Sequence, residues 1–529
     1  MTSTRHATNT ADATSTAEDR AAPADERWSD LYREATTAAV RPLREVVSPD
    51  GAVVGQVPVC TAEDVLLAAA RARVAQSAWA RTPLRERCAV MRRFADLVLE
   101  RETQLLDVVQ AETGKSRMSG FEELGDVVLT TAYYVRTAAA HLRPRRRRGL
   151  IPVLTRTVEH RRPVGVVGVV TPWNYPLTLA ASDAVPALLA GNAVVLKPDS
   201  RTPLTALLLL GLLREAGLPR DVMHVVTGAG TVLGPPLVEA VDHLMFTGST
   251  ATGRTLARQC ADRLIGFSAE LGGKNPMLVL DDADVGRAAE GAVQACFASS
   301  GQLCVSIERI YVADAVHDRF VAALVERVGR MRLGTGPGWD VEMGSLISAE
   351  QLATVQEHVA DALAQGAHLL AGGHARPDLG PTFHEPTVLT GVTDDMALAR
   401  EETFGPVVAV YRVTGDDEAV ARANDTVYGL NASVWSRARG PAVAARLRAG
   451  TVNINEGYAA TWGSHDAPIG GMGESGLGRR HGREGIVKYT ESQTISTQRL
   501  IAVGPSPALH GERYVRLMTY GIRLLRRLP

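Results

Sequence analysis

The chain has 529 residues, of which 45% are hydrophobic and 22% charged, and its net charge is −1. These values are typical of a soluble globular protein with two or three domains, and they exclude the strongly basic balance expected of a nucleic-acid-binding protein. The five cysteines lack metal-ligand spacing, no apolar run is long enough to cross a bilayer, and the N-terminus does not have the layout of a signal peptide. We therefore expect a cytoplasmic protein without a metal site.

The N-terminal part of the sequence predicts a tail followed by helices. Residues 1–26 are rich in Thr, Ala, Ser, Asp and Glu without an apolar period, which is typical of a disordered tail. Thr61 and Asp64 resemble a capping box that opens a helix. The features that follow are amphipathic helix at 90–106 and 127–138, a basic run at 143–149 and an alternating, strand-like segment at 151–160. The basic run indicates a solvated linker, with an anion or nucleic-acid contact as the alternative.

From residue 164 the pattern changes to short apolar runs separated by helices. Such alternation predicts right-handed crossovers and a mostly parallel sheet with helices on both faces, which is an α/β fold. Ligands of such sheets bind at the carboxyl ends of the strands. The expected strands are 164–170, 193–196, 222–226, 243–246 and 264–268, and the expected helices are 177–189, 203–216 and one from 231. The residues at the strand ends are Thr171 to Asn174, Lys197, Gly228, Thr247, Gly248 and Glu270.

A second α/β pattern extends from about residue 277 to 478 and predicts a second sheet. Its strand-like and helix-like segments are 310–313, 320–331, 351–365, 387–389, 407–411 and 451–455, the last expected to be an inner strand. The glycine-rich stretch 457–478 predicts a loop, residues 489–497 predict a strand, and the chain ends in a basic tail from Arg513.

Cys304 follows a small polar turn in the sequence and precedes a strand-like run. A free thiol with a pKa near ~8.5 is mostly protonated at neutral pH, and most intracellular cysteines are inert, so this stretch alone does not establish catalysis. Side chains that could serve the thiol are the amide of Asn174, the carboxylate of Glu270, Lys197 with Ser200, and Glu402 with Phe404. Each is weak by itself, and the glycines of residues 246–253 lack the spacing of the common dinucleotide-binding motif.

Taken together and in this order, these segments resemble the aldehyde dehydrogenase superfamily. The likeness spans roughly residues 45–500 and is fullest to the actinobacterial succinate-semialdehyde dehydrogenases. The matching segments are TPWNYP (171–176), LKPDS (196–200), MFTGSTATG (245–253), ELGGKNP (270–276), GQLC (301–304), EETFGP (401–406) and PIGGMGESGLGR (468–479). The resemblance implies a Rossmann-type cofactor domain, an α/β catalytic domain and a small β oligomerisation element.

The resemblance also gives chemical roles to three residues. Cys304 would attack the aldehyde carbon as a thiolate, Asn174 with the Cys304 backbone N–H would hold the oxyanion, and Glu270 would activate the water that hydrolyses the thioester. Cofactor contacts are expected from Thr171, Pro172, Trp173, Lys197, Ser200, Gly228, Phe246, Thr247, Gly248, Ser249, Leu271, Glu402 and Phe404.

Position 200 bears on the choice between NADP and NAD. Family members that prefer NAD generally carry Glu there, which repels a 2′-phosphate. Ser200 removes that repulsion, and Lys197 or Arg201 could pair with the phosphate. We therefore expect NADP to be preferred over NAD, with a merely solvated Arg201 as the alternative.

Succinate semialdehyde is the aldehyde substrate that the resemblance implies, although two positions depart from the pattern. Relatives hold the substrate carboxylate with arginines at positions that match Ser182 and Ala298, and neither residue can pair with a carboxylate. Tyr458, Trp462 and His465 could line a more apolar pocket, although a histidine in such a loop is more often an ordinary surface residue. Medium-chain or aromatic aldehydes are therefore the alternative substrates, and a non-catalytic descendant of the fold is a remote alternative.

The resemblance sets the expected domain boundaries. They are a disordered tail at 1–26, an NAD(P)-binding domain at 27–144 and 164–272, oligomerisation strands at 145–163 and 487–500, a catalytic domain at 273–486 and a basic tail at 501–529. Since the family's oligomerisation strands pair across subunits, we expect a homodimer or homotetramer. The tail residues 514–527 could form a basic amphipathic helix, which would pack against a neighbouring subunit or lie weakly on a membrane surface.

Overall fold

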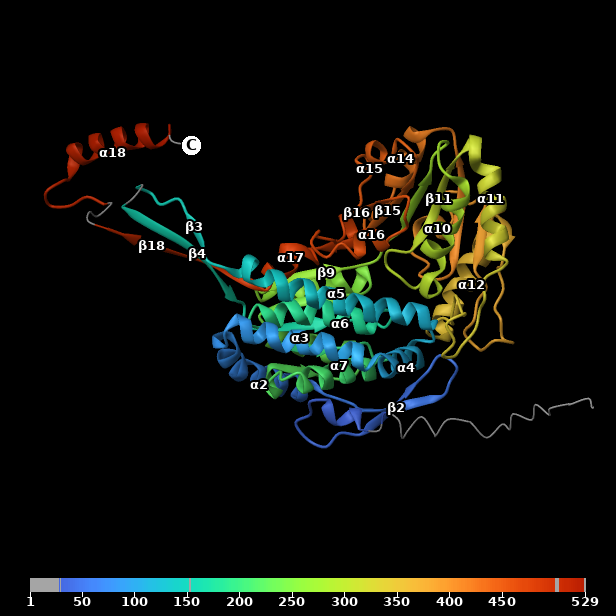
Figure 1. Ribbon diagram of the computed structural model, residues 1–529, viewed down its shortest axis with the longest axis horizontal. Coiled ribbons are helices and arrows are strands. Elements are labelled where there is room, and N and C mark those ends of the chain that lie inside the picture. Colours follow the sequence, from blue (N-terminus) through green and yellow to red (C-terminus); the bar gives the residue numbers. More distant parts are fainter. Residues whose placement is uncertain (1–27, 29, 152–153, 500–503, 528–529) are drawn as a thin grey trace, which may run out of the picture.

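The computed structural model describes residues 28, 30–151, 154–499 and 504–527. It consists of two α/β domains that lie against each other and an arm that projects from one of them (Figure 1). The predicted tail 1–26 lies outside the described residues. The described chain begins with a short 3-10 helix η1 (Leu31–Glu34) and an antiparallel hairpin of β1 (Leu43–Val47) and β2 (Val53–Pro58).

The first domain contains a six-stranded sheet in the order β17-β9-β8-β5-β6-β7, in which every pair except β17–β9 is parallel. Its strands are β5 (Val166–Val170), β6 (Ala193–Lys197), β7 (Met223–Val225), β8 (His243–Thr247), β9 (Gly266–Glu270) and β17 (Gly476–Leu477). Its helices are α2 (Ala62–Arg81), α3 (Leu84–Glu100), α4 (Glu102–Thr113), α5 (Arg117–Leu142), α6 (Pro176–Leu189), α7 (Pro203–Glu215), η2 (Arg220–Val222), α8 (Gly230–Ala240) and α9 (Thr250–Asp262).

Two hydrophobic cores cover the two faces of this sheet. Val167 and Val169 of β5 face a core built with α3, α5, α6 and α7, whereas Val166 faces a core built with α2, α8 and α9. The alternation follows from the two-residue period of a strand, and burial on both faces explains the unbroken apolar runs in the sequence. This arrangement confirms the predicted α/β fold with a parallel sheet.

The strand register brings the predicted ligand-binding residues to one edge. Val170 pairs with Lys197 and with Phe246, and Thr247 pairs with Glu270. Parallel strands that end level with one another place their following loops side by side, and such an edge is where ligands of these sheets bind.

The second domain contains a seven-stranded sheet in the order β12-β13-β14-β11-β10-β15-β16, parallel except for β12 against β13. Its strands are β10 (Asn275–Val279), β11 (Ile307–Ala313), β12 (His368–Ala371), β13 (Thr387–Thr390), β14 (Val407–Val413), β15 (Asn431–Trp435) and β16 (Thr451–Ile454). Its helices are α10 (Val285–Phe297), η3 (Ala298–Gly301), α11 (Asp314–Val328), α12 (Ala349–Ala364), α13 (Ala397–Arg400), α14 (Asp416–Asn424), α15 (Gly440–Ala444) and α16 (Ala459–Trp462). The chain then returns to the first domain, where η4 (Gly473–Ser475) leads into β17 and α17 (Gly482–Val487) packs against α5 and α6.

Three expectations for regular elements are wrong. The segment 451–455 is not an inner strand, because β16 lies at the edge of its sheet beside β15. The helix expected at 90–106 is two helices separated at Arg101, and the stretch 457–478 is not all loop. It contains α16, η4 and β17, and β17 adds an antiparallel edge strand to the first sheet.

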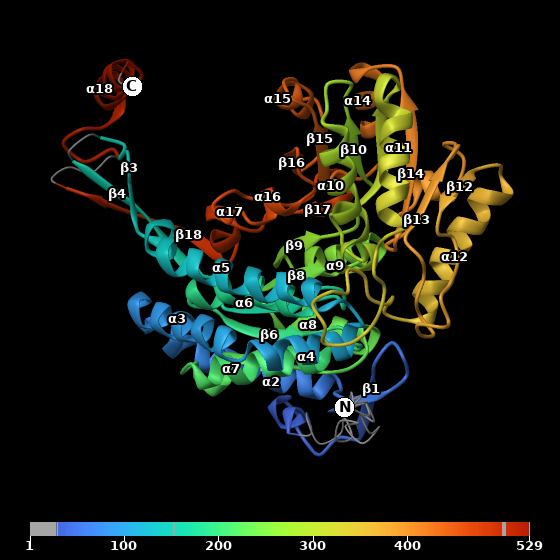
Figure 2. The same cartoon turned by 45° about the vertical axis from the view of Figure 1, so that its right-hand side comes forward.

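The arm is a three-stranded antiparallel sheet of β3 (Arg145–Arg147), β4 (Thr155–Pro163) and β18 (Thr490–Gln498), in the order β18-β4-β3. Helix α18 (Gly511–Leu525) follows it and lies at the tip, away from both domains (Figures 1 and 2). The basic run 143–149 is therefore not a linker, since its middle residues pair with β4. The strand expected at 151–160 begins at Thr155, whereas the strand expected at 489–497 matches β18.

Candidate active site

Cys304 follows a tight left-handed turn between α10 and β11. Ser299, Ser300 and Gly301 have φ angles of 50°, 58° and 69°. A Cβ at position 301 would overlap the carbonyl oxygen of Gly405, so glycine is required both by the conformation and by the close approach of the 402–405 loop. Asn275 Nδ2 donates to the Cys304 carbonyl at 2.8 Å and so fixes the backbone that carries the thiol.

The thiol of Cys304 is half-buried. Burial, together with the carboxylates of Glu270 and Glu402, raises the pKa of Cys304 to about 12. The same two carboxylates are those that the sequence assigns to water activation and to cofactor binding. A nucleophilic thiolate therefore requires a nearby base or a positive charge brought by a ligand.

Glu270 ends β9 and shares a small cavity with Cys304. The cavity is about 20 Å³, and Tyr458, Trp462 and Arg480 also line it. This volume is enough for one water molecule. Burial raises the pKa of Glu270 to about 7, which places the carboxyl near its optimum as a general base at neutral pH.

Asn174 is buried in the loop that follows β5. Its Nδ2 donates one hydrogen to the carbonyl of Gln302, two residues before Cys304, at 3.0 Å. The amide has a second hydrogen for an oxyanion. Lys115 Nζ donates to the Asn174 carbonyl at 2.6 Å and forms a buried ion pair with Glu123 at 2.5 Å. Lys115 and Glu123 therefore position this loop, a role that their helix-like sequence surroundings did not reveal.

Arg480 is a further site residue that sequence reasoning missed. It lines the cavity with Glu270, and its Nη2 pairs with buried Asp183 at 2.5 Å. Burial alone would raise the pKa of Asp183, but Arg480 and Lys488 outweigh burial and lower it to about 2. The partners are 297 positions apart in the chain, so no local pattern links them.

The predicted cofactor residues of β5, β6 and the loop after β7 gather at the carboxyl edge of the first sheet. The Thr171 N–H donates to the Lys197 carbonyl at 3.2 Å, and Ser200 Oγ donates to the Gly228 carbonyl at 2.9 Å. Lys197 Nζ donates to the Pro198 carbonyl, and burial lowers the pKa of Lys197. This edge includes Thr171, Pro172, Trp173, Lys197, Ser200 and Gly228.

Arg44 of β1 is the cation that contacts the Ser200 segment. Its guanidinium donates to the Ser200 carbonyl, and burial lowers the pKa of Arg44. Arg201, which with Lys197 was a candidate phosphate partner in the sequence, is exposed and lies 3.8 Å from Glu350. Arg44 is 156 positions away from Ser200 and carries no motif, which is why the sequence did not indicate it.

The predicted pyrophosphate residues lie where β8 meets α9. Phe246 and Thr247 end the strand, and Ser249 caps the helix by accepting from the Thr252 N–H. A Cβ at Gly248 would lie 2.6 Å from the Phe246 ring, so a side chain at this position is excluded and a ligand can approach the backbone closely. Leu271 packs against Gly253 in the first turn of α9.

Glu402 and Phe404 lie in a loop that contacts the turn of residues 299–301 before Cys304, here called the catalytic turn. Glu402 Oε1 accepts from the Gly273 N–H at 2.8 Å, and burial, with the carboxylate of Glu308, raises the pKa of Glu402 to about 8. Phe404 meets Trp173 edge to face, with ring centroids 5.4 Å apart. Glu308 accepts from the backbone of this loop and pairs with buried Lys274 at 2.5 Å.

The aldehyde side of the cavity is apolar and aromatic. A cluster of Tyr175, Leu179, Leu303, Val305, Leu430 and Tyr458 packs beside Cys304. Tyr458 and Trp462 line the cavity as expected, but His465 does not, because it is buried against Asp126 at 3.1 Å. Glu122 accepts from the Tyr175 and Tyr458 hydroxyls. Among the described residues that line the cavity, Arg480 is the only cation.

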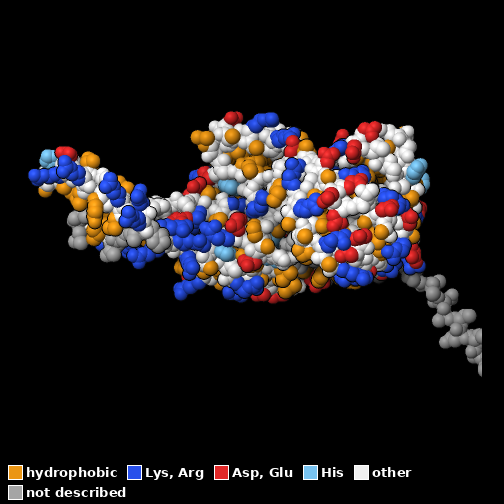
Figure 3. All heavy atoms as spheres, turned by 90° about the horizontal axis from the view of Figure 1, so that it is seen from above, with side chains coloured by type: hydrophobic (Ala, Val, Ile, Leu, Met, Phe, Trp, Pro, Cys, Tyr) orange, Lys and Arg blue, Asp and Glu red, His pale blue; other side chains and the backbone are white. Residues whose placement is uncertain are grey.

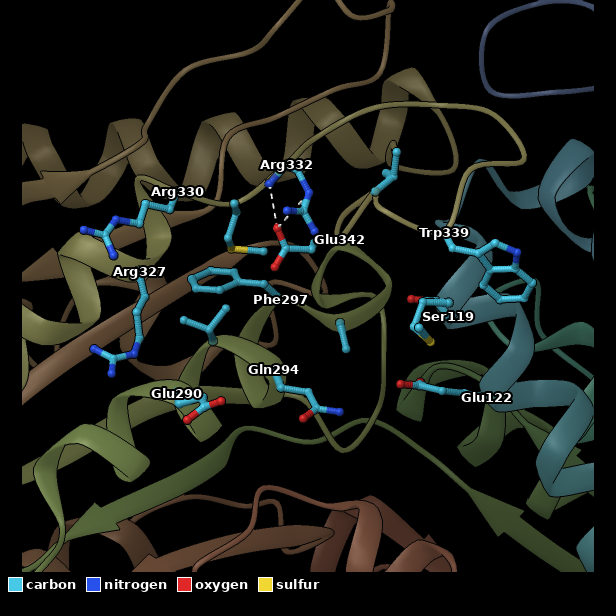
Figure 4. A pocket seen from close by; sticks show the side chains of 15 residues that line it. Ser119, Glu122, Glu290, Gln294, Phe297, Arg327, Arg330, Arg332, Trp339 and Glu342 are labelled. Carbon is cyan, nitrogen blue, oxygen red and sulfur yellow. Dashed lines mark hydrogen bonds and ion pairs between the residues drawn. The ribbon is translucent and has the colours of Figure 1, made fainter.

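A separate cleft of about 660 Å³ lies on the outer side of the catalytic turn (Figure 4). Glu122, Phe297 and Ala298 line it, together with residues of α11 and the segment that follows that helix. Arg332 pairs with Glu342 across its rim. The cleft does not share a lining residue with the cavity at Cys304, so its size does not make it the reaction site.

Comparisons with known proteins agree with this geometry. Residues 36–495 match the aldehyde dehydrogenase family. A Mycolicibacterium smegmatis protein named "putative succinate-semialdehyde dehydrogenase (NADP+)" is 56% identical over 491 residues, covering 92% of this chain and 95% of that protein. An NADP-dependent enzyme of E. coli has a TM-score of 0.85 at 34% identity, covering 89% of this chain and 99% of its own.

A betaine aldehyde dehydrogenase of Staphylococcus aureus in complex with NAD+ also has a TM-score of 0.85, at 33% identity, with 89% and 96% of the two chains covered. The family match covers most of the chain, and the relatives are aligned over nearly their whole lengths. The chain therefore belongs to the aldehyde dehydrogenase family.

Proposed function

We propose that the protein oxidises succinate semialdehyde to succinate with NADP, through a covalent intermediate on Cys304. The observation that carries this proposal is the water-sized cavity whose walls include both the thiol of Cys304 and the carboxylate of Glu270. A nucleophile and a base for water at one point are what hydrolytic aldehyde oxidation requires. The substrate and the preference for NADP are supported by the name of the mycobacterial relative.

The reaction uses three groups of the chain. Cys304 Sγ loses its proton and attacks the carbonyl carbon, while Asn174 Nδ2 and the Cys304 N–H donate to the oxygen that becomes negative. A bound nicotinamide would serve as the hydride acceptor, so that the group on Cys304 Sγ would become an acyl thioester. Glu270 removes a proton from water as the water attacks this thioester, and the acid leaves with the thiol restored. Overall, aldehyde, NADP+ and water give acid, NADPH and a proton.

The residues at the carboxyl edge of the first sheet fit a nicotinamide dinucleotide. Lys197 is a buried ammonium at a strand end, and Gly248 keeps the backbone bare at the entry to α9. Ser200 stands where a carboxylate would repel a 2′-phosphate, and Arg44 brings a guanidinium to the same segment. We propose that Lys197 and Ser200 hold the adenosine ribose and that Arg44 pairs with its phosphate.

Replacing Arg44 by alanine tests the NADP preference. We expect kcat/KM for NADP to fall by about tenfold or more, because a charge-assisted contact to phosphate is lost, while the value for NAD changes little. Arg201→Ala is the matched control, since that side chain is exposed, and it should leave both values near wild type. Equal losses for NADP and NAD in Arg44→Ala would mean that Arg44 only supports the fold.

The substrate assignment is tested by initial rates with succinate semialdehyde, hexanal and benzaldehyde. We expect the highest kcat/KM for succinate semialdehyde, although Ser182 and Ala298 do not offer a cation for its carboxylate. The aromatic wall of Tyr175 and Tyr458 suits uncharged aldehydes. Higher kcat/KM for hexanal or benzaldehyde would therefore reject the succinate semialdehyde assignment and leave the Cys304 chemistry intact.

We propose that the protein is a cytoplasmic homodimer or homotetramer assembled through the arm. Strand β18 forms one edge of the arm sheet, and its side chains are mostly exposed, including Ile495 at 44%. An exposed strand edge is a ready surface for pairing with another chain. The formal net charge of −1 offers no general attraction for nucleic acid.

We propose that α18 makes a weak contact with an anionic membrane surface. Val515, Leu517, Ile522 and Leu524 are exposed on this helix, and Arg513, Arg516, Arg523, Arg526 and Arg527 give it a strong positive charge. Figure 3 shows hydrophobic and basic side chains together at the end of the arm. Among the described residues, no helix is long and apolar enough to cross a membrane. Surface binding of this kind needs only an apolar face and nearby cations.

Flotation with vesicles tests the contact of α18. Wild-type protein should float with vesicles that contain phosphatidylglycerol and less with neutral ones, and Leu517→Glu with Ile522→Glu should abolish flotation. Val74→Glu, an exposed apolar position on α2, is the control and should float like wild type. Failure to float, together with a smaller mass of the Leu517→Glu, Ile522→Glu protein in solution, would mean that α18 packs against a second subunit instead.

A further inference from the structure

A buried polar cluster beside the aldehyde cavity is not used by the proposed reaction. It consists of Asp126 of α5, His465 in the loop after α16 and His481, which precedes α17. Their exposed fractions are 6%, 8% and 2%, so one carboxylate and two imidazoles are removed from bulk water. One potential ligand atom from each side chain lies within 4.8 Å of the others.

The polar atoms of this cluster are not satisfied by the described part of the protein. His465 Nε2 lies 3.1 Å from Asp126 Oδ1. Within the described residues, Asp126 Oδ2 and both ring nitrogens of His481 are without a hydrogen-bond partner. Buried polar atoms are rarely left unpaired, because each unpaired atom costs free energy of desolvation. The unpaired oxygen of Asp126 and the unpaired ring nitrogens of His481, beside the contact of Asp126 with His465, favour a bound species that is not protein.

The backbone around the two histidines holds them in place. The Gly482 N–H donates to the His465 carbonyl, and the Gly485 N–H donates to the His481 carbonyl, both at 2.8 Å. The two imidazole centroids are 4.8 Å apart, and the ring of Trp462 packs against His481 at 5.8 Å. The cluster is therefore formed by fixed segments of both domains rather than by mobile surface side chains.

We propose that Asp126, His465 and His481 bind a divalent transition-metal ion such as Zn²⁺ or Fe²⁺. Two imidazoles and one carboxylate are a donor set that such ions accept in proteins. Two donor atoms that each lie roughly 2.0–2.2 Å from one ion are at most about 4.4 Å apart. Asp126 and His465 already meet this condition at 3.1 Å, and a pair at the 4.8 Å limit of the cluster would need only a small side-chain rotation. No local spacing pointed to this site, because the expectation of no metal rested on the cysteines and Asp126 is 339 positions away from His465.

The ion would act on the cavity through its wall and not on the substrate. His481 follows Arg480, and Trp462 packs against His481, while both Arg480 and Trp462 line the cavity of Cys304. A metal that joins the loop after α16 to α5 would hold Arg480 and Trp462 in fixed positions relative to the thiol of Cys304. The site is therefore structural, and it is separate from the chemistry of Cys304 and Glu270.

Zinc content of the full-length protein tests the proposal. The measurement is made in the Cys304→Ala background, so that the catalytic thiol cannot be a ligand, after saturation with Zn²⁺ and gel filtration. We expect about one zinc per chain, and close to none in the same background with Asp126→Asn or His481→Asn, because three protein ligands are needed for retention. Asn at position 481 keeps a polar side chain and a single Cβ, so it should add no backbone strain beyond that of His481, whose φ of 56° and ψ of −179° are unfavourable for any residue other than glycine.

His368→Asn is the matched control, because His368 is exposed on β12, and it should retain the zinc. Cobalt gives a second readout that does not depend on any variant of the cluster. Co²⁺ added to the Cys304→Ala protein should show visible d–d bands without thiolate charge-transfer bands. Absence of bound zinc and of these bands, or full zinc content in the His481→Asn protein, would overturn the proposal.

Discussion

At the scale of single residues, the proposed role of Glu270 makes hydrolysis of the acyl enzyme depend on the pKa of this carboxyl group. Burial raises this pKa to about 7. The carboxylate form is the base, so the rate of hydrolysis has its full value above the pKa and falls as the pH decreases through the pKa. The acid limb of the kcat profile is therefore expected near pH 7 when hydrolysis limits turnover, rather than near the ordinary pKa of a carboxyl group.

The pH profile of kcat from pH 5 to 9 checks this expectation. Below the pKa, kcat should fall by about tenfold per pH unit, because one protonation removes the base. Glu270→Gln should lose the limb together with most of its turnover. A wild-type profile that stays flat down to pH 5 would show that Glu270 does not act as the base in the limiting step.

Gly301 is the residue at which the turn before Cys304 is least tolerant of a side chain. Its φ is 69°, and a Cβ there would overlap the Gly405 carbonyl. We expect Gly301→Ala to destabilise the fold by about 2 kcal/mol or more, since both the left-handed conformation and the contact oppose a methyl group. Chemical denaturation measures the change.

Gly125→Ala is the control for this substitution. Gly125 lies inside α5, and a Cβ there would not meet any atom within 4 Å. Alanine should leave stability unchanged or increase it by about 0.5–1 kcal/mol, because it is the better helix former. Similar losses of stability for both variants would contradict the assignment of a special role to the turn.

Motifs predicted some site residues and not others, for a physical reason. Cys304, Glu270 and Asn174 stand at strand ends or turns that local sequence marks, and the structure brings them together. Arg480 pairs with Asp183 across 297 positions, and Arg44 meets Ser200 across 156. Such residues act through distant partners, and only the folded chain reveals the pairing.

At the scale of elements, apolar runs and strand-end residues were enough to predict the five parallel strands of the first sheet, but not its antiparallel edge strand β17. The strands β5, β6, β7 and β8 are almost entirely buried, so the apolar runs in the sequence match their lengths. The second sheet was less predictable. β16 is as strand-like in sequence as its neighbours, and its place at the edge depends on pairing with β15 alone. The basic run 145–147 became a strand because β4 offered a partner.

The arm leads to a prediction about strand β18. Ile495 lies on the exposed strand β18, opposite Val158 of β4. If this strand pairs with a second subunit, a charge there should weaken assembly, and Ile495→Asp should reduce the mass in analytical ultracentrifugation. Val74→Asp, which places the same charge on exposed α2, should keep the wild-type mass. Unchanged mass in Ile495→Asp would place the interface elsewhere.

At the scale of the whole molecule, the active site is formed only where the two domains meet. The first domain supplies Asn174 and Glu270, the second supplies Cys304, and Gly301 against Gly405 joins the catalytic turn to the loop that carries Glu402. Family membership covers residues 36–495, which includes both domains and most of the arm. The chemistry is therefore a property of the assembled chain and not of either domain alone.

The proposed mechanism depends most directly on the separate tasks of Cys304 and Glu270. The measurement is stopped-flow formation of NADPH with succinate semialdehyde in wild type, Glu270→Gln and Cys304→Ala. We predict a burst of about one NADPH per active subunit in Glu270→Gln, followed by turnover about a hundredfold or more slower than wild type, because the acyl enzyme forms and is not hydrolysed. Cys304→Ala should not show a burst. A wild-type steady rate in Glu270→Gln, or a burst in Cys304→Ala, would contradict the mechanism.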